Sequence, residues 1–406
     1  MNLLLLYPIF MAIFWSIGSI FYFLINETKL KNKPNYSVES HGITFLLSCF
    51  NEEETIKDTI ENILSLKYKT KELIVINDGS SDNTADVIKQ LQSHLSFKLI
   101  DLKENKGKAN ALNQGLKIAN NEFVMCIDAD TIIDDDAPYY MVEDLLKNES
   151  VGAVTGNPRI RNKSSLLGKI QTVEYSSIIG GIKRAQSVVG KINTISGVFT
   201  LFRKSAVVEV NGWDTDMITE DIAISWKLHL KDWSIKYEPR ALCWMLVPET
   251  LLGLWNQRIR WAQGGHEVLI RDLKGGLKTF NIRIYILLFE QLLSLVWIYI
   301  IVILLAYTIL NTNFLDFYNY EYNFTVFLLS AFVLTFINLI QFAISMFIDN
   351  KYEKQNILVV LFLSWYPTFY WMINALVSVV AFPKAIKRKK GGYAVWTSPD
   401  RGNIKH

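Results

Sequence analysis

Long apolar runs at both ends of the chain constrain its fold more than any other sequence feature. Residues 3–25 carry no charged side chain, and a helix over this run would be ~35 Å long, enough to cross the hydrocarbon core of a membrane. Further apolar runs follow at 284–310, 324–348 and 357–382. Residues 40–245 lie between them and have ordinary globular composition, so we expect one soluble domain held at a membrane.

The flanks of the first run indicate its orientation. No charged side chain precedes it, so residues 1–28 are expected to stay in place as an anchor rather than act as a cleaved signal peptide. Lys29, Lys31 and Lys33 follow directly. The positive-inside rule then places these lysines, and the soluble domain behind them, in the cytoplasm.

The C-terminal flanks give a conflicting count. Residues 311–323 contain no Lys or Arg and are expected outside, whereas the basic tail at 383–406 is expected inside. Four complete crossings would leave that tail outside. One segment is therefore expected to be re-entrant, interfacial or a short hairpin, and Pro367 makes 357–382 the first candidate.

Charge and cysteine content exclude several classes of protein. The net charge is only +3, and no recognition motif accompanies the basic tail, so we expect no nucleic-acid partner. The three cysteines, Cys49, Cys126 and Cys243, each lie in an apolar stretch without metal-site spacing and are predicted to be small core residues. The five histidines show no paired spacing, which argues against zinc.

Apolar strands alternate with helical patterns in the first half of the soluble domain. This alternation predicts an α/β fold with a mostly parallel sheet, in which ligands bind beyond the carboxyl ends of the strands. Asn51 is a plausible cap for the first helix. The strands are predicted at 43–49, 72–76, 97–101 and 122–127. The first helix is predicted to follow Asn51 and end near residue 66, and two further helices are predicted at 83–94 and 107–119.

Acidic residues stand at two of these strand ends. Asp128 and Asp130 are two apart in an extended segment, so both carboxylates can approach one Mg²⁺ or Mn²⁺ ion. Asp78 follows an earlier strand and can accept hydrogen bonds from a base or ribose, or cap the helix at 83–94. Lys108 can pair with a diphosphate or simply lie on the surface.

Two later motifs add candidate site residues. Thr219-Glu220-Asp221 precedes a helical pattern, so its acids either stabilise the helix N-terminus or supply a general base. Gln257, Arg260 and Trp261 share one helical face. Such a face suits a sugar diphosphate, since Arg binds phosphate and Trp stacks on a sugar ring, although a membrane-surface helix would also carry these residues.

Taken in order, these four motifs resemble the processive family 2 glycosyltransferases, the synthases of cellulose, chitin, hyaluronan and poly-N-acetylglucosamine. The resemblance covers nearly the whole chain. It is closest to the biofilm-type synthases of poly-β-1,6-N-acetylglucosamine, on stretches such as ENKGKANALNQG, MCIDADTIIDDDAPYYM and RIRWAQGGHEVLIRD.

The resemblance implies a GT-A fold, a multi-pass position in the cytoplasmic membrane, and inverting transfer from UDP-N-acetylglucosamine to a growing glycan. Asp221 would be the base, and Asp128 and Asp130 would hold the metal. It also implies interfacial helices at 246–283, three apolar segments within 284–382 and a small accessory membrane subunit. Asp78, Lys108, Asp128, Asp130, Gln257, Arg260 and Trp261 would bind the nucleotide sugar, and Glu220, Ser196, Gly197 and Trp261 would lie on the acceptor side.

Three other functions account for these motifs less well. An inactive membrane scaffold would have no need of these acids together with Arg260. A glycoside hydrolase needs two carboxylates but no metal-binding pair beside an Arg and a Trp. A transferase that adds one sugar and stops is disfavoured by the Gln257–Trp261 motif, which marks the processive branch. Within that branch only the resemblance, not physical chemistry, selects N-acetylglucosamine over the sugars of hyaluronan, chitin or cellulose.

Overall fold

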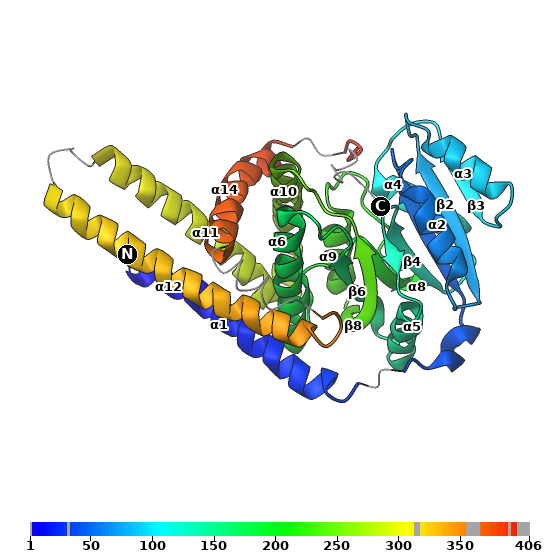
Figure 1. Ribbon diagram of the computed structural model, residues 1–406, viewed down its shortest axis with the longest axis horizontal. Coiled ribbons are helices and arrows are strands. Elements are labelled where there is room, and N and C mark those ends of the chain that lie inside the picture. The colour runs from blue at the N-terminus through cyan, green and yellow to red at the C-terminus, as the bar shows by residue number, and fades with distance from the viewer. Residues whose placement is uncertain (1, 31–32, 312–316, 355–365, 389–390, 396–406) are drawn as a thin grey trace.

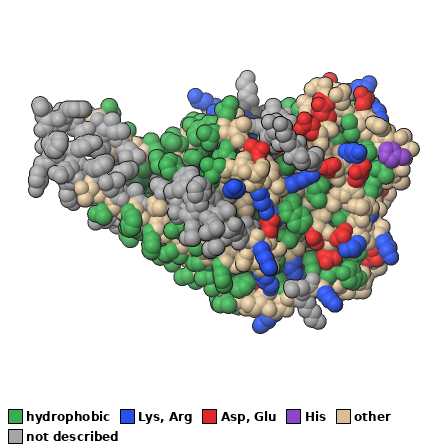
Figure 2. Space-filling view, viewed as in Figure 1, with side chains coloured by type: hydrophobic (Ala, Val, Ile, Leu, Met, Phe, Trp, Pro, Cys, Tyr) green, Lys and Arg blue, Asp and Glu red, His purple; other side chains and the backbone are tan. Residues whose placement is uncertain are grey.

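The computed structural model describes residues 2–30, 33–311, 317–354, 366–388 and 391–395. In Figure 1 a sheet with helices on both faces forms one end of the molecule, and long helices project from it toward the other end. Hydrophobic side chains dominate the surface of the projecting part, whereas charged side chains gather over the sheet (Figure 2). The two compositions seen along the sequence thus occupy opposite ends of the molecule.

Eight strands form a single sheet in the described part of the chain, in the order β3-β2-β1-β4-β7-β6-β8-β5. The segment β3-β2-β1-β4 is parallel throughout, because a helix returns the chain to the same edge after each of these strands. The strands are β1 Ile43–Cys49, β2 Lys71–Asp78, β3 Lys98–Leu102, β4 Phe123–Asp128, β5 Ile132–Ile133, β6 Val151–Ile160, β7 Phe199–Arg203 and β8 Ser234–Met245.

The second half of the sheet is more mixed than the sequence suggested. β7 runs antiparallel to both β4 and β6, and β5 runs antiparallel to β8, whereas β6 and β8 are parallel. The chain leaves β6 and, after α6, η3 and α7, enters β7 at the same end of the sheet, so β7 runs in the reverse direction. The expected α/β class is confirmed, and its parallel character is concentrated in the first four strands.

Helices cover both faces of the sheet. α2, α3 and α5 pack on one face, and α4, α8 and α9 pack on the other. Every residue of β1 is buried because both faces are covered. The three cysteines are buried and free, as predicted. The bounds are α2 Ile56–Ser65, α3 Thr84–Gln92, α4 Lys108–Ile118, α5 Ala137–Lys147, α8 Lys204–Glu209 and α9 Glu220–Leu230.

A group of helices lies between the sheet and the projecting helices (Figure 1). α10 packs against α9 on the sheet side and against α11 and α14 on the other. α6 continues through a π-helical turn, η3, into α7. The bounds are α6 Leu166–Tyr175, η3 Ser176–Ile182, α7 Lys183–Val189, α10 Leu251–Lys278 and α14 Tyr366–Lys387.

Three helices in the described residues are long and apolar enough to cross a membrane, over Leu6–Glu27, Ile282–Leu304 and Phe332–Asp349. They belong to α1 with the following π-helical turn η1, to α11 and to α12. The bounds are α1 Asn2–Tyr22, η1 Phe23–Glu27, α11 Ile282–Asn311 and α12 Phe317–Asp349, and a short 3₁₀ helix η2, Tyr36–Ser40, precedes the sheet.

The fourth predicted apolar run, 357–382, is only partly described. Its first part, 357–365, lies outside the described residues, and its second part lies in α14, which packs along α10. Arg388, directly after α14, forms an ion pair with Glu267 of α10. The basic tail therefore begins beside the same helix that packs on the sheet domain.

Two local predictions were wrong. Asn51 does not cap α2: it has φ 55° in the preceding loop, and its Oδ1 accepts a hydrogen bond from the Ser81 amide, 2.8 Å away. The segment 311–323 is not a loop throughout, since α12 already begins at Phe317. A polar, Tyr- and Asn-rich sequence at a helix end gives no periodicity by which the boundary can be found.

A buried set of charges joins the membrane-type helices to the sheet domain. The Arg184 side chain is fully buried and donates to Glu27 at 2.5 Å and to Asp349 at 2.7 Å. Arg159 of β6 reaches the other Asp349 oxygen at 2.7 Å, and the Tyr352 hydroxyl donates to Glu27 at 2.6 Å. Two guanidinium groups and two carboxylates thus balance one another, which buried charges require.

Candidate active site

A buried lysine gathers two of the predicted acidic residues. The Lys108 ammonium, at the start of α4, lies 2.5 Å from an Asp128 oxygen and 2.9 Å from a Glu220 oxygen, and donates to the Gly197 carbonyl at 3.0 Å. Three elements that are distant in sequence therefore meet here: the end of β4, the start of α9 and the turn before β7. Lys108 is 8% exposed, so the surface-lysine alternative is wrong.

Electrostatics keep Lys108 charged. Burial alone would lower the pKa of its ammonium, but the carboxylates of Asp128 and Glu220 outweigh burial and hold that pKa well above its usual range. Its charge is directed at Asp128 and Glu220. The ammonium is therefore already paired with two carboxylates, and its predicted contact with a diphosphate stays a prediction.

Asp221, the predicted base, lies at the edge of this cluster. Its Oδ1 accepts a hydrogen bond from the Ile222 amide at 2.9 Å. Burial and the neighbouring Glu220 raise the pKa of Asp221 to about 6, against the opposing effects of Lys108, the Ile222 amide and Arg260. A carboxylate with this pKa is ionised at neutral pH yet more basic than an ordinary aspartate, which suits proton abstraction.

The Ser196–Gly197 turn, which is predicted on the acceptor side, borders Asp221. Both residues, with Glu220 and Asp221, line a small cavity at this point. A Cβ atom on Gly197 would lie 2.9 Å from Asp221 Oδ2, a distance that real Cβ atoms do not tolerate. Glycine is needed here because the turn passes directly against the carboxylate.

Asp78 lies on a second edge of the site, at the end of β2. Its Oδ1 accepts a hydrogen bond from the Lys106 amide at 3.1 Å, and its Oδ2 is buried without a partner in the described residues. Burial raises the pKa of Asp78 to about 6, although the Lys106 and Gly107 amides oppose the rise. Asp82, not Asp78, bonds the first amide of α3, so the capping alternative is wrong.

The C-terminal tail covers the loop that Asp78 holds. The Ala394 amide donates to the Thr215 carbonyl at 2.7 Å, and the Lys106 ammonium lies 5.7 Å from the centre of the Tyr393 ring. Gly107 has φ 87°, and a Cβ atom there would collide with the Ala394 carbonyl oxygen. This part of the tail, Gly391–Val395, carried no sequence signal that would have placed it here.

Asp128 and Asp130 offer a plausible pair of metal ligands. Asp130 is 4% exposed and accepts a hydrogen bond from the Thr131 hydroxyl at 3.2 Å. In the described residues no cluster of three or more Asp, Glu, His or Cys side chains could hold a metal by itself. Two carboxylates without further protein ligands fit Mg²⁺ or Mn²⁺, which complete their shell with water and phosphate oxygens.

The three predicted residues of α10, Gln257, Arg260 and Trp261, have different surroundings. Arg260 lies within electrostatic range of Asp221, and its positive charge opposes the rise in the pKa of that carboxyl. Gln257 is 8% exposed, and its Oε1 is buried without a partner in the part of the chain described. The Trp261 ring lies 6.4 Å from Tyr175, and the Arg258 guanidinium lies over it at 4.4 Å.

Sequence reasoning missed the partner of Arg258. Its guanidinium forms a 2.6 Å ion pair with Glu174 of α6, whose other oxygen accepts from the Tyr366 hydroxyl at 2.8 Å. All three side chains are buried. This contact fixes α10 against α6 and α14, and only a contact between distant segments, which a single sequence does not reveal, would have predicted it.

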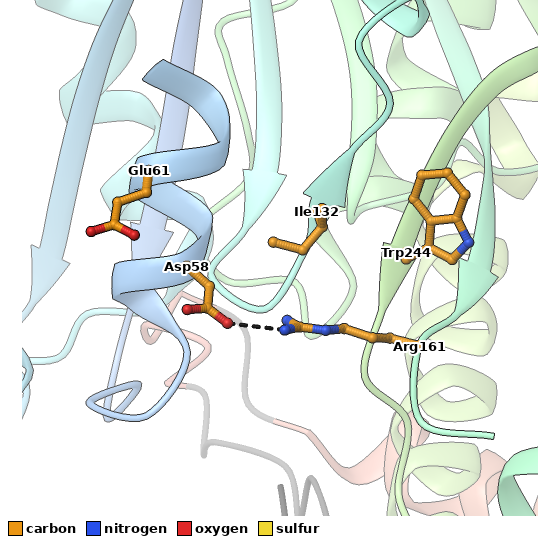
Figure 3. A pocket seen from close by; sticks show the side chains of 5 residues that line it. All are labelled: Asp58, Glu61, Ile132, Arg161 and Trp244. Carbon is orange, nitrogen blue, oxygen red and sulfur yellow. Dashed lines mark hydrogen bonds and ion pairs between the residues drawn. The ribbon is translucent and has the colours of Figure 1, made fainter. Parts of the chain in front are cut away.

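A separate cleft opens between α2 and the strands β5 and β8 (Figure 3). Arg161 and Asp58 form a 2.9 Å ion pair across it, with Glu61 on one wall and Trp244 on the other. Ile132 lines its floor and lies two residues after Asp130, so the cleft adjoins the candidate metal ligands. None of the predicted site residues lines it.

Acidic side chains at the carboxyl ends of parallel strands, on a sheet layered between helices, define a GT-A glycosyltransferase domain. Residues 44–210 match the family model described as Glycosyl transferase family 2. The chain belongs to this family and is a glycosyltransferase, which confirms the prediction made from the motifs.

Relatives of known name extend the match over nearly the whole chain. The chain is 62% identical to a poly-beta-1,6-N-acetyl-D-glucosamine synthase of Staphylococcus epidermidis, over 99% of this chain and 98% of the relative. It is equally identical to the protein of that name from Staphylococcus aureus strain COL, with the same coverage. The predicted resemblance to this group is confirmed.

One solved structure shares the fold at low sequence identity. The mannosyltransferase PcManGT from Pyrobaculum calidifontis, solved in complex with GDP-Man and Mn²⁺, aligns with a TM-score of 0.56 and 17% identity. The alignment covers 94% of this chain and 99% of the mannosyltransferase. At this identity the match establishes the shared fold.

Proposed function

We propose that this chain is an inverting, processive synthase that polymerises N-acetylglucosamine from UDP-N-acetylglucosamine into a β-1,6-linked glycan. The observation that carries the proposal is the 62% identity, over nearly the full length of both chains, to synthases named for that polymer. The geometry supports it: a carboxylate suited to proton abstraction stands beside the acidic residues that Lys108 gathers in a family 2 domain.

Each side chain of the cluster has a role in this reaction. Asp221 takes the proton from the acceptor hydroxyl as that oxygen attacks the anomeric carbon. A single displacement inverts the configuration, so an α-linked donor gives a β-linkage. Lys108 holds Asp128 and Glu220 in place by ion pairs, and Arg260 directs positive charge at Asp221.

The remaining predicted residues bind the two substrates. Asp78 presents its free Oδ2 to the nucleoside, and the Gln257 side chain presents its free oxygen to the sugar or acceptor. Asp128 and Asp130 would hold Mg²⁺ or Mn²⁺, which neutralises the charge that develops on the leaving diphosphate. A mannosyltransferase with this fold was solved with Mn²⁺, which supports a divalent ion.

The topology supports a cytoplasmic catalytic domain. Three crossings by α1, α11 and α12 leave the sheet domain and the tail on one side, as the contact between Ala394 and Thr215 requires. Lys29 and Lys33 flank the inner end of the first crossing, which favours the cytoplasm for that side. A polymer made there would leave through the membrane-spanning part, and the accessory subunit stays a prediction from family resemblance.

The test uses membranes that contain the full chain, with and without a small membrane partner subunit. UDP-N-acetylglucosamine is supplied with Mg²⁺ or Mn²⁺, UDP release is followed, and the product is treated with a β-1,6-N-acetylglucosaminidase. We expect metal-dependent UDP release and a digestible polymer. An undigested polymer would refute the linkage, and no release from any UDP-sugar would refute the function.

Asp221→Asn tests the base within the same assay. Loss of a general base costs about 10²–10⁴-fold in rate. UDP binding, measured by calorimetry, should stay near that of the parent protein because Asp221 does not touch the nucleotide in this proposal. Loss of UDP binding together with activity would contradict the assignment. In the parent, kcat/KM should fall below about pH 6 as Asp221 gains its proton.

A further inference from the structure

We propose that Lys183 is a positioning residue for this reaction: through the Thr155 hydroxyl it holds the Ser196–Gly197 turn against Asp221. This inference rests on the proposed function of the site. No sequence motif pointed to Lys183, which is the first residue of α7 and follows the π-helical turn η3 directly. Such π-turns are frequent at functional sites.

Lys183 is an unusual buried cation. Its side chain is 4% exposed, and its ammonium donates to the Thr155 hydroxyl at 3.1 Å. Among the described residues no carboxylate lies within ion-pair distance of it, whereas the buried Lys108, Arg159 and Arg184 all have such partners. A buried ammonium without an ion pair is costly, so its retention needs a reason in the surrounding structure.

The Thr155 hydroxyl connects Lys183 to the acceptor turn. Its oxygen accepts a second hydrogen bond, from the Ser196 amide at 2.8 Å. Two donors fill both lone pairs of this oxygen. The turn is fixed on its other sides as well, because the Ser196 carbonyl accepts from the Thr200 hydroxyl at 2.7 Å and the Gly197 carbonyl accepts from Lys108.

The position of this turn determines the position of the base. Gly197 passes so close to Asp221 that a single added methyl group would lie 2.9 Å from Oδ2. From the other side, the Ser225 hydroxyl donates to the Asp221 carbonyl at 2.7 Å and accepts from the Ile195 amide at 3.0 Å. A shift of the turn would therefore move the Asp221 carboxylate or open space beside it.

The two charges also influence each other. Burial lowers the pKa of Lys183 to about 7, while the Asp221 carboxylate from α9 and Cys243 from β8 act to raise it. The interaction is mutual, so a charged Lys183 favours the ionised form of Asp221. The other charged groups that face Asp221 are Glu220, Lys108 and Arg260.

The experiment compares four variants of the full-length protein in membranes by UDP release across pH 5 to 9. Lys183→Met should lower kcat on the order of 10- to 100-fold, leave the KM for the UDP-sugar unchanged, and move the acidic limb of kcat/KM up by about half a pH unit or more. Lys183→Arg keeps the positive charge, so the acidic limb of kcat/KM should fall at the same pH as in the parent protein. Thr155→Val should lower kcat without moving the limb.

Lys191→Met is the matched control. Lys191 is also buried, at 5% exposure, has a pKa lowered by burial, and donates to a backbone carbonyl, that of Trp233. It does not contact the turn, so its loss should leave both the limb and kcat unchanged.

Two results would overturn the inference. Lys183→Met with parental kinetics would show that the amine has no influence, and Lys183→Met with reduced kcat but an unmoved limb would reduce its role to packing. If the methionine variant does not accumulate in membranes, Thr155→Val decides, and parental kcat there overturns the inference. Absence of UDP release from the parent protein is a separate result and counts against the proposed function instead.

Discussion

The two halves of the sheet domain bury their polar groups in different ways. In the nucleotide half, from β1 to β4, the core between sheet and α2 or α3 is apolar, and the ion pairs are mostly exposed, such as that between Lys89 and Asp101. In the membrane-facing half, guanidinium–carboxylate pairs are themselves core residues, as for Arg184 with Glu27 and Asp349. The first half is layered between helices of the sheet domain itself, whereas the second is completed by helices of the membrane part.

This difference predicts where the loss of an ion pair will lower the free energy of unfolding most. Apolar burial is spread over many contacts, so exposed charges in the nucleotide half can be lost with little consequence. A buried ion pair is different, because removal of one partner leaves the other charge without compensation in a low-dielectric interior. The predictions below compare these two situations.

Arg184→Met should have the largest effect on stability. It leaves the carboxylates of Glu27 and Asp349 without their shared partner, which costs about 3–5 kcal/mol for a buried pair. Thermal unfolding of the detergent-solubilised protein, followed by light scattering and intrinsic fluorescence, measures the loss. Lys89→Met, which removes an exposed pair of the nucleotide half, is the control and should leave the melting temperature unchanged. Equal effects of the two variants would abolish the contrast between the halves.

Gly107→Ala should have an intermediate effect. The backbone at φ 87° disfavours any side chain, and the added methyl would collide with the Ala394 carbonyl. Together these cost about 1–2 kcal/mol and displace the tail from the loop at Lys106 and Gly107, which we call the donor loop because Asp78, the proposed nucleoside ligand, holds it. UDP affinity by calorimetry should fall with the melting temperature. Gly392→Ala, in the same tail with open space around it, is the matched control and should behave as the parent.

Asp78→Asn should have the smallest effect, and one that depends on pH. The pKa of this carboxyl is raised from 3.8 to about 6, so the folded protein binds its proton more tightly than the unfolded chain does. The ionised group therefore destabilises the fold above about pH 6, and this penalty disappears as the pH falls toward 4. Asn should raise the melting temperature at pH 7.5 but not at pH 4.5, by on the order of 1 kcal/mol in unfolding free energy.

The opposite pH dependence, or none, would mean that the Asp78 carboxylate is not penalised by burial. UDP binding should weaken in the same variant. The asparagine amide is uncharged, so it is a weaker hydrogen-bond acceptor for the nucleoside than the Asp78 carboxylate. Asp82→Asn, which alters a neighbouring carboxylate that accepts from the Thr84 amide, provides the comparison.

The sequence predicted the nucleotide half well, since its alternation of apolar strands and amphipathic helices is a local property. The strand predicted at 122–127 is β4, Phe123–Asp128, and the helix predicted at 107–119 is α4, Lys108–Ile118. Local pattern also brought Asp128 and Glu220 into consideration, but their shared ion pair with Lys108 joins segments that are distant in sequence and could not be foreseen.

The membrane-facing half was predicted poorly for the same reason. The reversed strand β7, the pair of Arg258 with Glu174 and the isolated amine of Lys183 all depend on contacts between segments distant along the chain. In the sequence alone, a buried arginine cannot be told from an exposed one. It is therefore predicted on the surface until its carboxylate partner is known. The error at Asn51 in the nucleotide half arose because a polar residue before a helix resembles a cap but here bonds to another loop.

The contact of the tail with the donor loop links activity to the time course of protein synthesis. Gly107 emerges from the ribosome long before Ala394, and at ordinary elongation rates the interval is roughly 15–60 s. During that time the first four strands can fold, but the loop at Gly107 lacks its cover and α11 and α12 are still being inserted. A chain stalled or truncated late in translation would thus contain every acidic residue of the site and still have an open donor loop. The loop at Gly107 is thus covered only after Ala394 has been synthesised, long after the strands that carry the acidic residues.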